Sequence, residues 1–223
     1  MSPTLSIVAL WLAFAASHVL LSSLRVRPRI VSVVGERAFL GLYSLVAFAC
    51  FVPLVWVYLA NKHSGPMLWS IPMSPWLEGL VSLAMGVAFV LVVAGIVTPS
   101  PASLGAAGQA RVEVRGVHRL TRHALFMGLG LFGLVHLIPN GFASDVAFFA
   151  GFPVFAIVGC LHQDARKLAT EAERYGPYHA ATPLIPFTGK DTLRGLRELA
   201  PVAVGVGIAL AVIVRVFHAR LFG

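Results

Sequence analysis

The sequence predicts an all-α, polytopic membrane protein, a helical bundle with about six transmembrane helices. Of its 223 residues, 58% are hydrophobic and 12% are charged, and its mean hydropathy is +0.85. An ordinary soluble domain carries about twice that charged fraction. Apolar runs of about 20 residues, long enough to cross a hydrocarbon core of roughly 30 Å as a helix, recur along the whole chain.

Six apolar runs are predicted as spans, at residues 3–24, 38–60, 77–97, 123–138, 143–161 and 200–217. The first has no basic segment before it and is too long for a secretory signal, so we expect it to be retained as a span. The fourth is short and rich in glycine. Pro139 and Asn140 end it, which predicts a tight hairpin with the fifth. Because no internal repeat is found, residues 1–223 are predicted to form a single membrane domain.

Basic residues predict the orientation of these spans. The loops after the first, third and fifth runs carry most of the lysines and arginines, whereas the loops after the second and fourth hold only Lys62. By the positive-inside rule the basic loops are cytoplasmic and the N-terminus lies on the opposite side. Arg215 and Arg220 leave the side of the C-terminus open. The net charge of +8 reflects this topology and contact with lipid headgroups, so no nucleic-acid partner is predicted.

Two histidines, His18 and His136, lie well inside predicted spans. An ionisable side chain there faces the bundle interior, a partner or a cofactor, because exposure to hydrocarbon costs free energy. Imidazole is an iron ligand, and small residues on the same helical face, such as Ala15, Ser22 and Gly133, would let a flat haem approach. Hydrogen bonding and close packing between helices explain the same features, so both interpretations stay open.

The two histidines differ in predicted depth. At 1.5 Å per residue, His18 lies roughly 10 Å from the basic end of its span, and His136 lies roughly 20 Å from the basic end of its own. Equal depth would require helix tilt or shifted span ends. The candidate partners for haem propionates are basic residues on the cytoplasmic side: Arg25, Arg37, Arg119 and Arg122. Topology alone explains these arginines as well.

A second group of polar residues lies on the cytoplasmic side. The stretch GVHRLTRHALFMGLG places Arg119, Arg122 and His123 at the mouth of the fourth span. Residues 164–187 are predicted to form a charged helical segment that two prolines close. Together they predict a surface pocket for an anionic or zwitterionic small molecule. The alternative is an amphipathic helix at the membrane interface.

Several stretches resemble the NnrU family of bacterial membrane proteins: SHVLLSSLR, GERAFLGLYSLVAF, RLTRHALFMG, LVHLIPNG and the segment from HQDARKL to PLIPF. The resemblance covers most of the chain and implies a bacterial inner membrane. With the orientation given by the positive-inside rule, the N-terminus is then expected in the periplasm. That family is similar to plant zeta-carotene isomerase, a membrane enzyme that contains haem b and isomerises a cis double bond of a polyene. By spacing, the haem ligands of the isomerase correspond to His18 and His136. Whether His123 pairs with His18 in place of His136 stays open.

Two departures limit what the resemblance implies. The isomerase has a cysteine three residues before its second ligand, where this chain has Gly133, so ligand exchange through that cysteine is not expected. RHALFMG and EAERYGPYHAATPLIP also resemble membrane methyltransferases that use S-adenosylmethionine. Here Ala124 and Phe126 replace a proline and a tyrosine of those enzymes, and Glu171 and Glu173 stand where a doubled acidic pair is usual.

Three functions follow as hypotheses. The first is a haem b membrane protein that either catalyses a redox-gated cis–trans isomerisation of an apolar substrate or senses nitric oxide or another diatomic ligand. The NnrU name is associated with nitrite and nitric oxide metabolism. The second is a membrane methyltransferase built on Arg122, His123, Glu171 and Glu173. The third is a non-catalytic accessory subunit. Whether the protein is an enzyme, and its oligomeric state, stay open.

Overall fold

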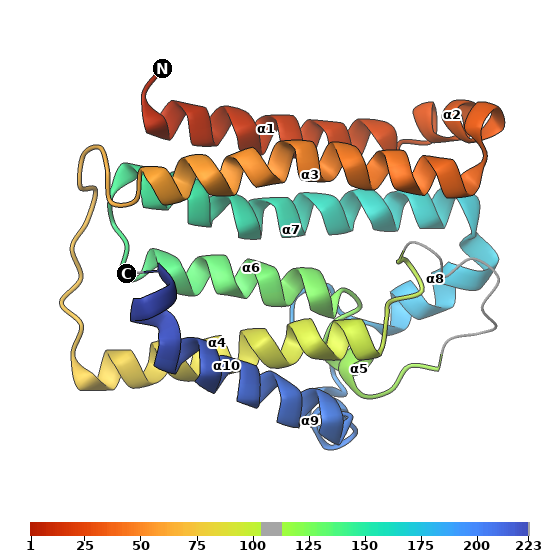
Figure 1. Ribbon diagram of the computed structural model, residues 1–223. Helices are drawn as coiled ribbons and strands as arrows, with labels where there is room; N and C mark the ends of the chain where they lie inside the picture. The colour runs from red at the N-terminus through yellow and green to blue at the C-terminus, as the bar shows by residue number, and fades with distance from the viewer. Residues whose placement is uncertain (104–112, 223) are drawn as a thin grey trace. The chain divides into compact units, whose positions relative to one another are not determined.

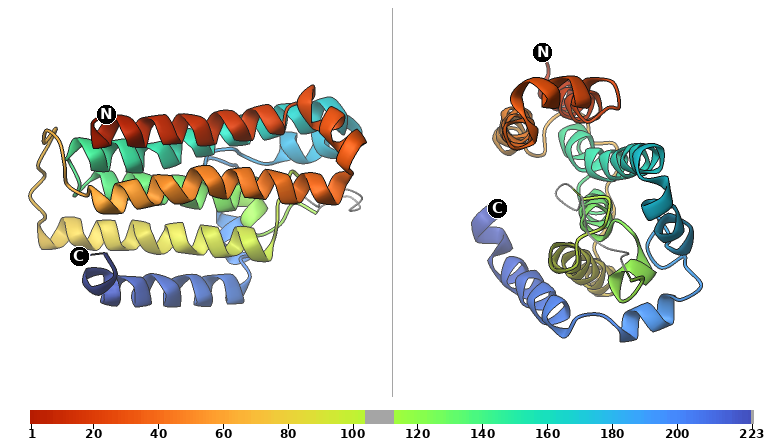
Figure 2. Two further views of the ribbon diagram at one scale, coloured as in Figure 1. Left: turned by 45° about the horizontal axis from the view of Figure 1, so that its top comes forward. Right: turned by 90° about the vertical axis from the view of Figure 1, so that its right-hand side faces the viewer.

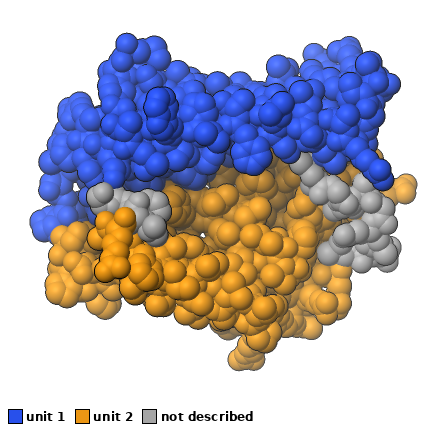
Figure 3. Space-filling model, viewed as in Figure 1, with its two compact units in different colours: residues 1–72, 136–155 blue, residues 73–135, 156–223 orange. Residues whose placement is uncertain are grey.

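The computed structural model describes residues 1–103 and 113–222. These residues form ten α-helices and, apart from one isolated bridge between Met67 and Phe142, no β structure (Figure 1, Figure 2). This confirms the predicted all-α fold class. Contacts divide the chain into two compact units: unit 1 holds residues 1–72 and 136–155, and unit 2 holds residues 73–135 and 156–223 (Figure 3). The single domain expected from the sequence stays a prediction.

Unit 1 is built from α1 (Pro3–Leu21), α2 (Val26–Val34), α3 (Glu36–Ala60) and the part of α7 (Ala143–Thr170) that ends at residue 155. Helix α1 begins at Pro3, where proline suits the first helical position, and the Ser2 hydroxyl accepts a hydrogen bond from the Leu5 N–H. Helices α1 and α3 pack side by side, as Figure 1 and both views of Figure 2 show.

Aromatic residues make the core of unit 1. The Trp11 indole N–H donates to the Phe148 carbonyl at 3.0 Å, and the indole packs edge-on against Phe152. Gly151 leaves room for this indole, because a Cβ at that position would overlap it. Tyr58 is buried and stacks on Phe148 with ring centroids 3.9 Å apart. These contacts hold α1 and α3 against α7.

Unit 2 contains α4 (Pro75–Val97), α5 (Val117–Leu120), α6 (Ala124–Leu137) up to residue 135, the remainder of α7, α8 (Ala172–Ala181), α9 (Thr192–Arg197) and α10 (Pro201–Phe222). Glycines bring its helices close together. A Cβ on Gly128 would meet the Ala88 carbonyl, and one on Gly207 would meet the Val90 backbone. Close approach through small residues is how membrane helices commonly pack. Helix α4 is therefore in contact with both α6 and α10.

Five helices of the described residues are long and apolar enough to cross a membrane: α1, α3, α4, α7 and α10. Large apolar side chains on them, such as Leu12, Phe48 and Leu83, are exposed, which suits contact with lipid. The chain is therefore an integral membrane protein. The fourth predicted span, residues 123–138, is too short to cross the membrane as a straight helix: α6 has 14 residues, about 21 Å of helix, against a hydrocarbon core of roughly 30 Å. Residues 138–142 form the predicted turn between α6 and α7.

Two boundaries differ from the prediction. Residues 26–34 form helix α2, although the sequence predicts a loop there. Helix α7 continues to Thr170 instead of ending at residue 161. It continues because its polar residues are satisfied within the fold: Asp164 and Lys167 are buried and ion-paired. Helix α8 confirms the helical segment predicted before Pro183.

Candidate functional site

His18 lies in the last turn of α1. Its Nδ1–H donates to the Phe14 carbonyl at 2.8 Å. Because a neutral imidazole carries one N–H, this bond leaves the Nε2 lone pair for coordination. Histidines that bind metals commonly fix their tautomer by donating the other N–H to a carbonyl or carboxylate. The local geometry of His18 therefore suits a metal ligand.

Aromatic rings from three helices surround His18. The ring centroids of Phe14, Tyr43 and Phe155 lie 4.1, 5.0 and 5.3 Å from the imidazole centroid. These rings belong to α1, α3 and α7, so the long helices of unit 1 converge at this residue. Within residues 1–103 and 113–222, no group of three or more His, Cys, Asp or Glu side chains is arranged to hold a metal ion. A haem iron needs only one or two protein ligands.

His136 lies in the last turn of α6, and its ring stacks on Phe149 with centroids 4.5 Å apart. Phe149 and the His18 neighbour Phe155 are six residues apart on α7, which is about 9 Å along the helix axis. The two imidazoles therefore contact different turns of α7. Both histidines lie near helix ends and not well inside a span, because α1 and α6 end within about one turn of them. If His18 and His136 are to bind one iron, their side chains must move toward each other from their contacts with Phe155 and Phe149.

The four arginines predicted to hold haem propionates fall into two groups. Arg25 and Arg37 are exposed in unit 1, the unit that contains His18. The other two belong to unit 2 and pair with protein carboxylates: Arg119 with Asp191 and Glu198, and Arg122 with Asp164. Arg25 and Arg37 are thus the two that share a unit with His18.

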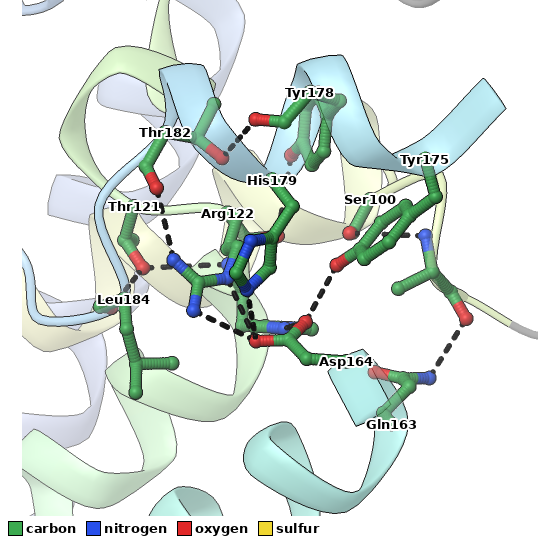
Figure 4. A network of polar contacts seen from close by, with 12 residues as sticks. Ser100, Thr121, Arg122, Gln163, Asp164, Tyr175, Tyr178, His179, Thr182 and Leu184 are labelled. Atoms are coloured by element: carbon green, nitrogen blue, oxygen red, sulfur yellow. Dashed lines mark hydrogen bonds and ion pairs between the residues drawn. The ribbon is translucent and has the colours of Figure 1, made fainter. Parts of the chain in front are cut away.

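A buried polar cluster surrounds the Asp164 carboxylate near the end of α7 (Figure 4). Arg122 Nε donates to Oδ2 at 2.8 Å, and His123 Nε2 donates to Oδ1 at 2.6 Å. The Tyr175 hydroxyl donates to Oδ1 at 2.5 Å, and His179 Nε2 lies 3.7 Å from Oδ2. One carboxylate therefore joins α7, α8 and the segment before α6.

The segment before α6 is also anchored to the chain that follows α8. Arg122 Nη1 donates to the Thr182 carbonyl at 2.9 Å, and the Thr121 hydroxyl donates to the Leu184 carbonyl at 2.6 Å (Figure 4). The Arg122 backbone N–H donates to the Pro183 carbonyl. The Arg-His element and the proline-rich segment that the sequence suggested as one region are thus hydrogen-bonded to each other.

Burial keeps two tyrosines of this cluster protonated. Burial and the neighbouring Asp164 carboxylate raise the pKa of Tyr175 far above its usual value. Burial also raises the pKa of Tyr178, whose ring packs edge-on against His118. The Tyr175 hydroxyl is therefore a permanent donor to Asp164 at neutral pH.

A second ion-pair cluster joins α5 to the end of α9. Glu198 Oε2 accepts from the Gly116 N–H at 3.0 Å and from Arg119 Nε at 2.9 Å. Gly116 has a φ of 55°, which favours glycine. The bond from the Gly116 N–H, together with the Arg194 and Arg119 side chains, lowers the pKa of Glu198 to about 2.

Glu198→Gln is expected to reduce the acid sensitivity of the fold. The folded pKa of Glu198 lies below the ordinary value of 4.5, so its ionised form stabilises the fold above that value, and this stabilisation is lost as the pH falls toward 2. The thermal midpoint of the wild type should fall more steeply than that of E198Q between about pH 5 and pH 3. Glu113→Gln is the control, because its ion pair with Arg115 is exposed. Parallel curves for wild type and E198Q would contradict this role.

Unit 1 holds another buried carboxylate. Asp145 is fully buried and accepts from the His63 backbone N–H at 3.1 Å and from its Nδ1 at 2.8 Å. His63 has a φ of 53°, a strained conformation for a residue other than glycine, and these two bonds hold it. The Ser144 hydroxyl accepts from the Ser64 N–H at 2.9 Å. The loop after α3 is therefore fastened to the start of α7.

The sequence pattern points to Arg122 and His123 but not to Asp164. It suggests Glu171 and Glu173 as the acidic pair, whereas Glu171 pairs with neighbouring basic side chains of α7 and α8, and Glu173 is exposed. One sequence feature could have pointed to Asp164: it is an acidic residue in the polar C-terminal part of a helix whose preceding part is apolar. A buried carboxylate needs a cationic or hydrogen-bonding partner, and that requirement leads to the arginine and histidine before α6.

Comparisons with known proteins extend these observations. The model of the family described as "NnrU protein" matches residues 6–223. The chain is 23% identical over 188 residues to 15-cis-zeta-carotene isomerase, chloroplastic, of Arabidopsis thaliana, and 22% identical over 180 residues to that of Zea mays. These alignments cover 83% and 80% of this chain and 50% and 48% of the relatives, so the chain spans about half their length. No solved structure matches. The comparisons lend no support to the likeness to methyltransferases.

Proposed function

The chain belongs to the NnrU family of membrane proteins, and from this premise we propose that it is a haem b protein whose iron is held by His18. Its curated relatives are named zeta-carotene isomerases. The proposal therefore extends to catalysis: isomerisation of a double bond in an apolar, polyene-like substrate taken from the bilayer.

The observation that carries the proposal is the fixed tautomer of His18. Its Nδ1–H is engaged by the Phe14 carbonyl, so Nε2 is unprotonated, as iron ligation requires. The surrounding rings of Phe14, Tyr43 and Phe155 supply flat apolar surfaces of the kind that pack against a macrocycle. The residues around His18 thus fit the group.

His136 is the second residue that would hold the iron. A single protein ligand leaves the iron a position for a diatomic molecule, whereas two permanent ligands favour electron transfer. One protein ligand would therefore favour a sensor of nitric oxide or a similar molecule, and two would favour a redox-gated catalyst. His136 contacts α7 at Phe149, so its approach to the iron would require a change in that contact.

The chain's own residues would orient the iron ligand, exclude water and admit an apolar substrate. Bound haem would supply a redox-active iron at His18. The Phe14 carbonyl fixes the imidazole, and the rings around it exclude water. Exposed apolar side chains on α1 and α3 give a lipid-dissolved substrate direct access to unit 1. Arg25 and Arg37 are the proposed propionate partners at the membrane surface.

The orientation in a bacterial inner membrane, with the N-terminus in the periplasm, is part of the same proposal. It rests on the basic residues after the first, third and fifth predicted spans. A cysteine placed at Lys62 should react with an impermeant maleimide added to the periplasm, whereas one placed at Arg25 should not. The reverse pattern would overturn this orientation.

Absorption spectra of the purified protein, oxidised and reduced with dithionite, test the haem proposal together with a pyridine haemochromogen assay. We expect a Soret band, sharp reduced α and β bands, and about one haem per chain. His136→Ala should change a six-coordinate spectrum to a five-coordinate one if both histidines bind the iron, and His218→Ala in α10 is the control. A colourless protein from cells supplied with haem precursor would contradict the proposal and favour the accessory-subunit hypothesis.

A further inference from the structure

We propose that unit 2 contains a binding site for a phosphate-type oxyanion at the N-terminus of α6. The site is a cavity of about 30 Å³ whose wall includes Thr98, Ser100, Arg122 and His123. All residues of the wall belong to unit 2, whereas His18 and His136 belong to unit 1. The proposal therefore does not depend on haem binding.

The first turn of α6 supplies backbone donors to this cavity. The Met127 N–H donates to the His123 carbonyl at 2.9 Å and begins the hydrogen-bond ladder of the helix. The N–H groups of Ala124, Leu125 and Phe126 consequently have no acceptor within α6, and these three residues line the cavity. The N-terminus of this 14-residue helix also carries a partial positive charge.

His123 supplies an independent indication of a ligand. It is 2% exposed, and its Nδ1 is buried without a hydrogen-bond partner among the described residues. Its Nε2 is directed to Asp164, which is not part of the cavity wall. Nδ1 is therefore the polar atom that His123 offers to the cavity. Leaving such an atom unpaired costs free energy that a bound ligand recovers.

The side chains that line the cavity favour an oxyanion over a metal cation. The described wall contains a guanidinium group, hydroxyls of Thr98, Ser100 and Ser103, and no carboxylate. A metal cation would find no anionic ligand there, whereas an oxyanion accepts hydrogen bonds from each of these groups. A cavity of roughly 10–15 Å³ already admits a water molecule, so this one holds a group of a few atoms. The ligand is a free phosphate or the phosphate of a lipid headgroup.

His123 presents a hydrogen-bond acceptor to the cavity. Because Nε2–H already donates to Asp164, the neutral imidazole leaves Nδ1 with a lone pair. The P–OH group of a hydrogen phosphate donates to such an atom, while its other oxygens accept from the donors of the wall.

Calorimetric titration of the full-length, detergent-purified protein tests the site. The probes are inorganic phosphate and a short-chain phosphatidic acid. His123→Ala should weaken binding about tenfold or more, because it removes the buried hydrogen-bonding group at Nδ1. Thr98→Val keeps the shape of the wall, removes one hydroxyl and should weaken binding about threefold. His179→Ala is the matched control, since His179 also lies beside Asp164 but does not line the cavity.

The outcomes separate the two sources of the phosphate group. In both cases we expect the loss of affinity to be largest for H123A, smaller for T98V and absent for H179A. If inorganic phosphate binds with this ranking, the ligand is a free anion. If only phosphatidic acid binds with this ranking, the ligand is a lipid headgroup. The proposal is overturned if neither probe binds, if T98V and H123A bind as the wild type does, or if H179A weakens binding as much as H123A. If H123A fails to fold, the comparison of T98V with H179A decides.

Discussion

Asp164→Asn is expected to destabilise the protein by about 3–5 kcal/mol, because it leaves a buried guanidinium without its counter-charge. Asp164 is 3% exposed and Arg122 is 7% exposed, so water does not screen their ion pair. His123 and Tyr175 lose an ionised acceptor in the same variant. The free energy of unfolding in mixed detergent micelles measures the effect.

The control for Asp164→Asn is Asp191→Asn. Asp191 pairs with Arg119, but its side chain is 62% exposed, and exposed pairs contribute about 0–1 kcal/mol. Equal losses in the two variants would contradict the structural role of Asp164. The double variant Arg122→Leu with Asp164→Leu removes both charges and should recover part of the stability lost in Asp164→Asn.

His18→Ala is expected to lower the haem content of the purified protein about tenfold or more, because it removes the proposed iron ligand. The fold should be retained, since His18 is only half-buried and its side-chain hydrogen bond lies within its own helix. The haem-to-protein absorbance ratio measures the loss, with the thermal midpoint as a check on folding. A ratio equal to that of the wild type would remove His18 as the ligand.

The membrane fold was predictable because lipid imposes one rule on the backbone. A segment that crosses hydrocarbon must satisfy its N–H and C=O groups internally, so each long apolar run becomes a helix. The prediction failed where polar residues continue a helix, as α7 does through Asp164 and Lys167. Hydropathy shows only where the apolar run ends, at residue 161. The helix continues to Thr170 because its polar side chains find partners within the fold.

The candidate sites were predictable only where the signal is local. His18 is conspicuous because it is ionisable in an apolar run, and Arg122 and His123 are conspicuous as neighbours. The acceptor they share, Asp164, lies some 40 residues further along the chain, and α8 supplies the remaining donors. No periodicity in the sequence connects those segments. The unpaired Nδ1 of His123 depends on packing between them and needed the structure.

Imidazole rescue of His18→Gly tests the assignment of His18 to the iron most directly. The variant should be purified from cells supplied with haem precursor, with and without imidazole, because free imidazole can occupy the space of the missing side chain. We predict that the variant alone lacks the wild-type Soret band and that imidazole restores it. A wild-type spectrum without imidazole, or a wild-type protein that binds no haem at all, would contradict the assignment.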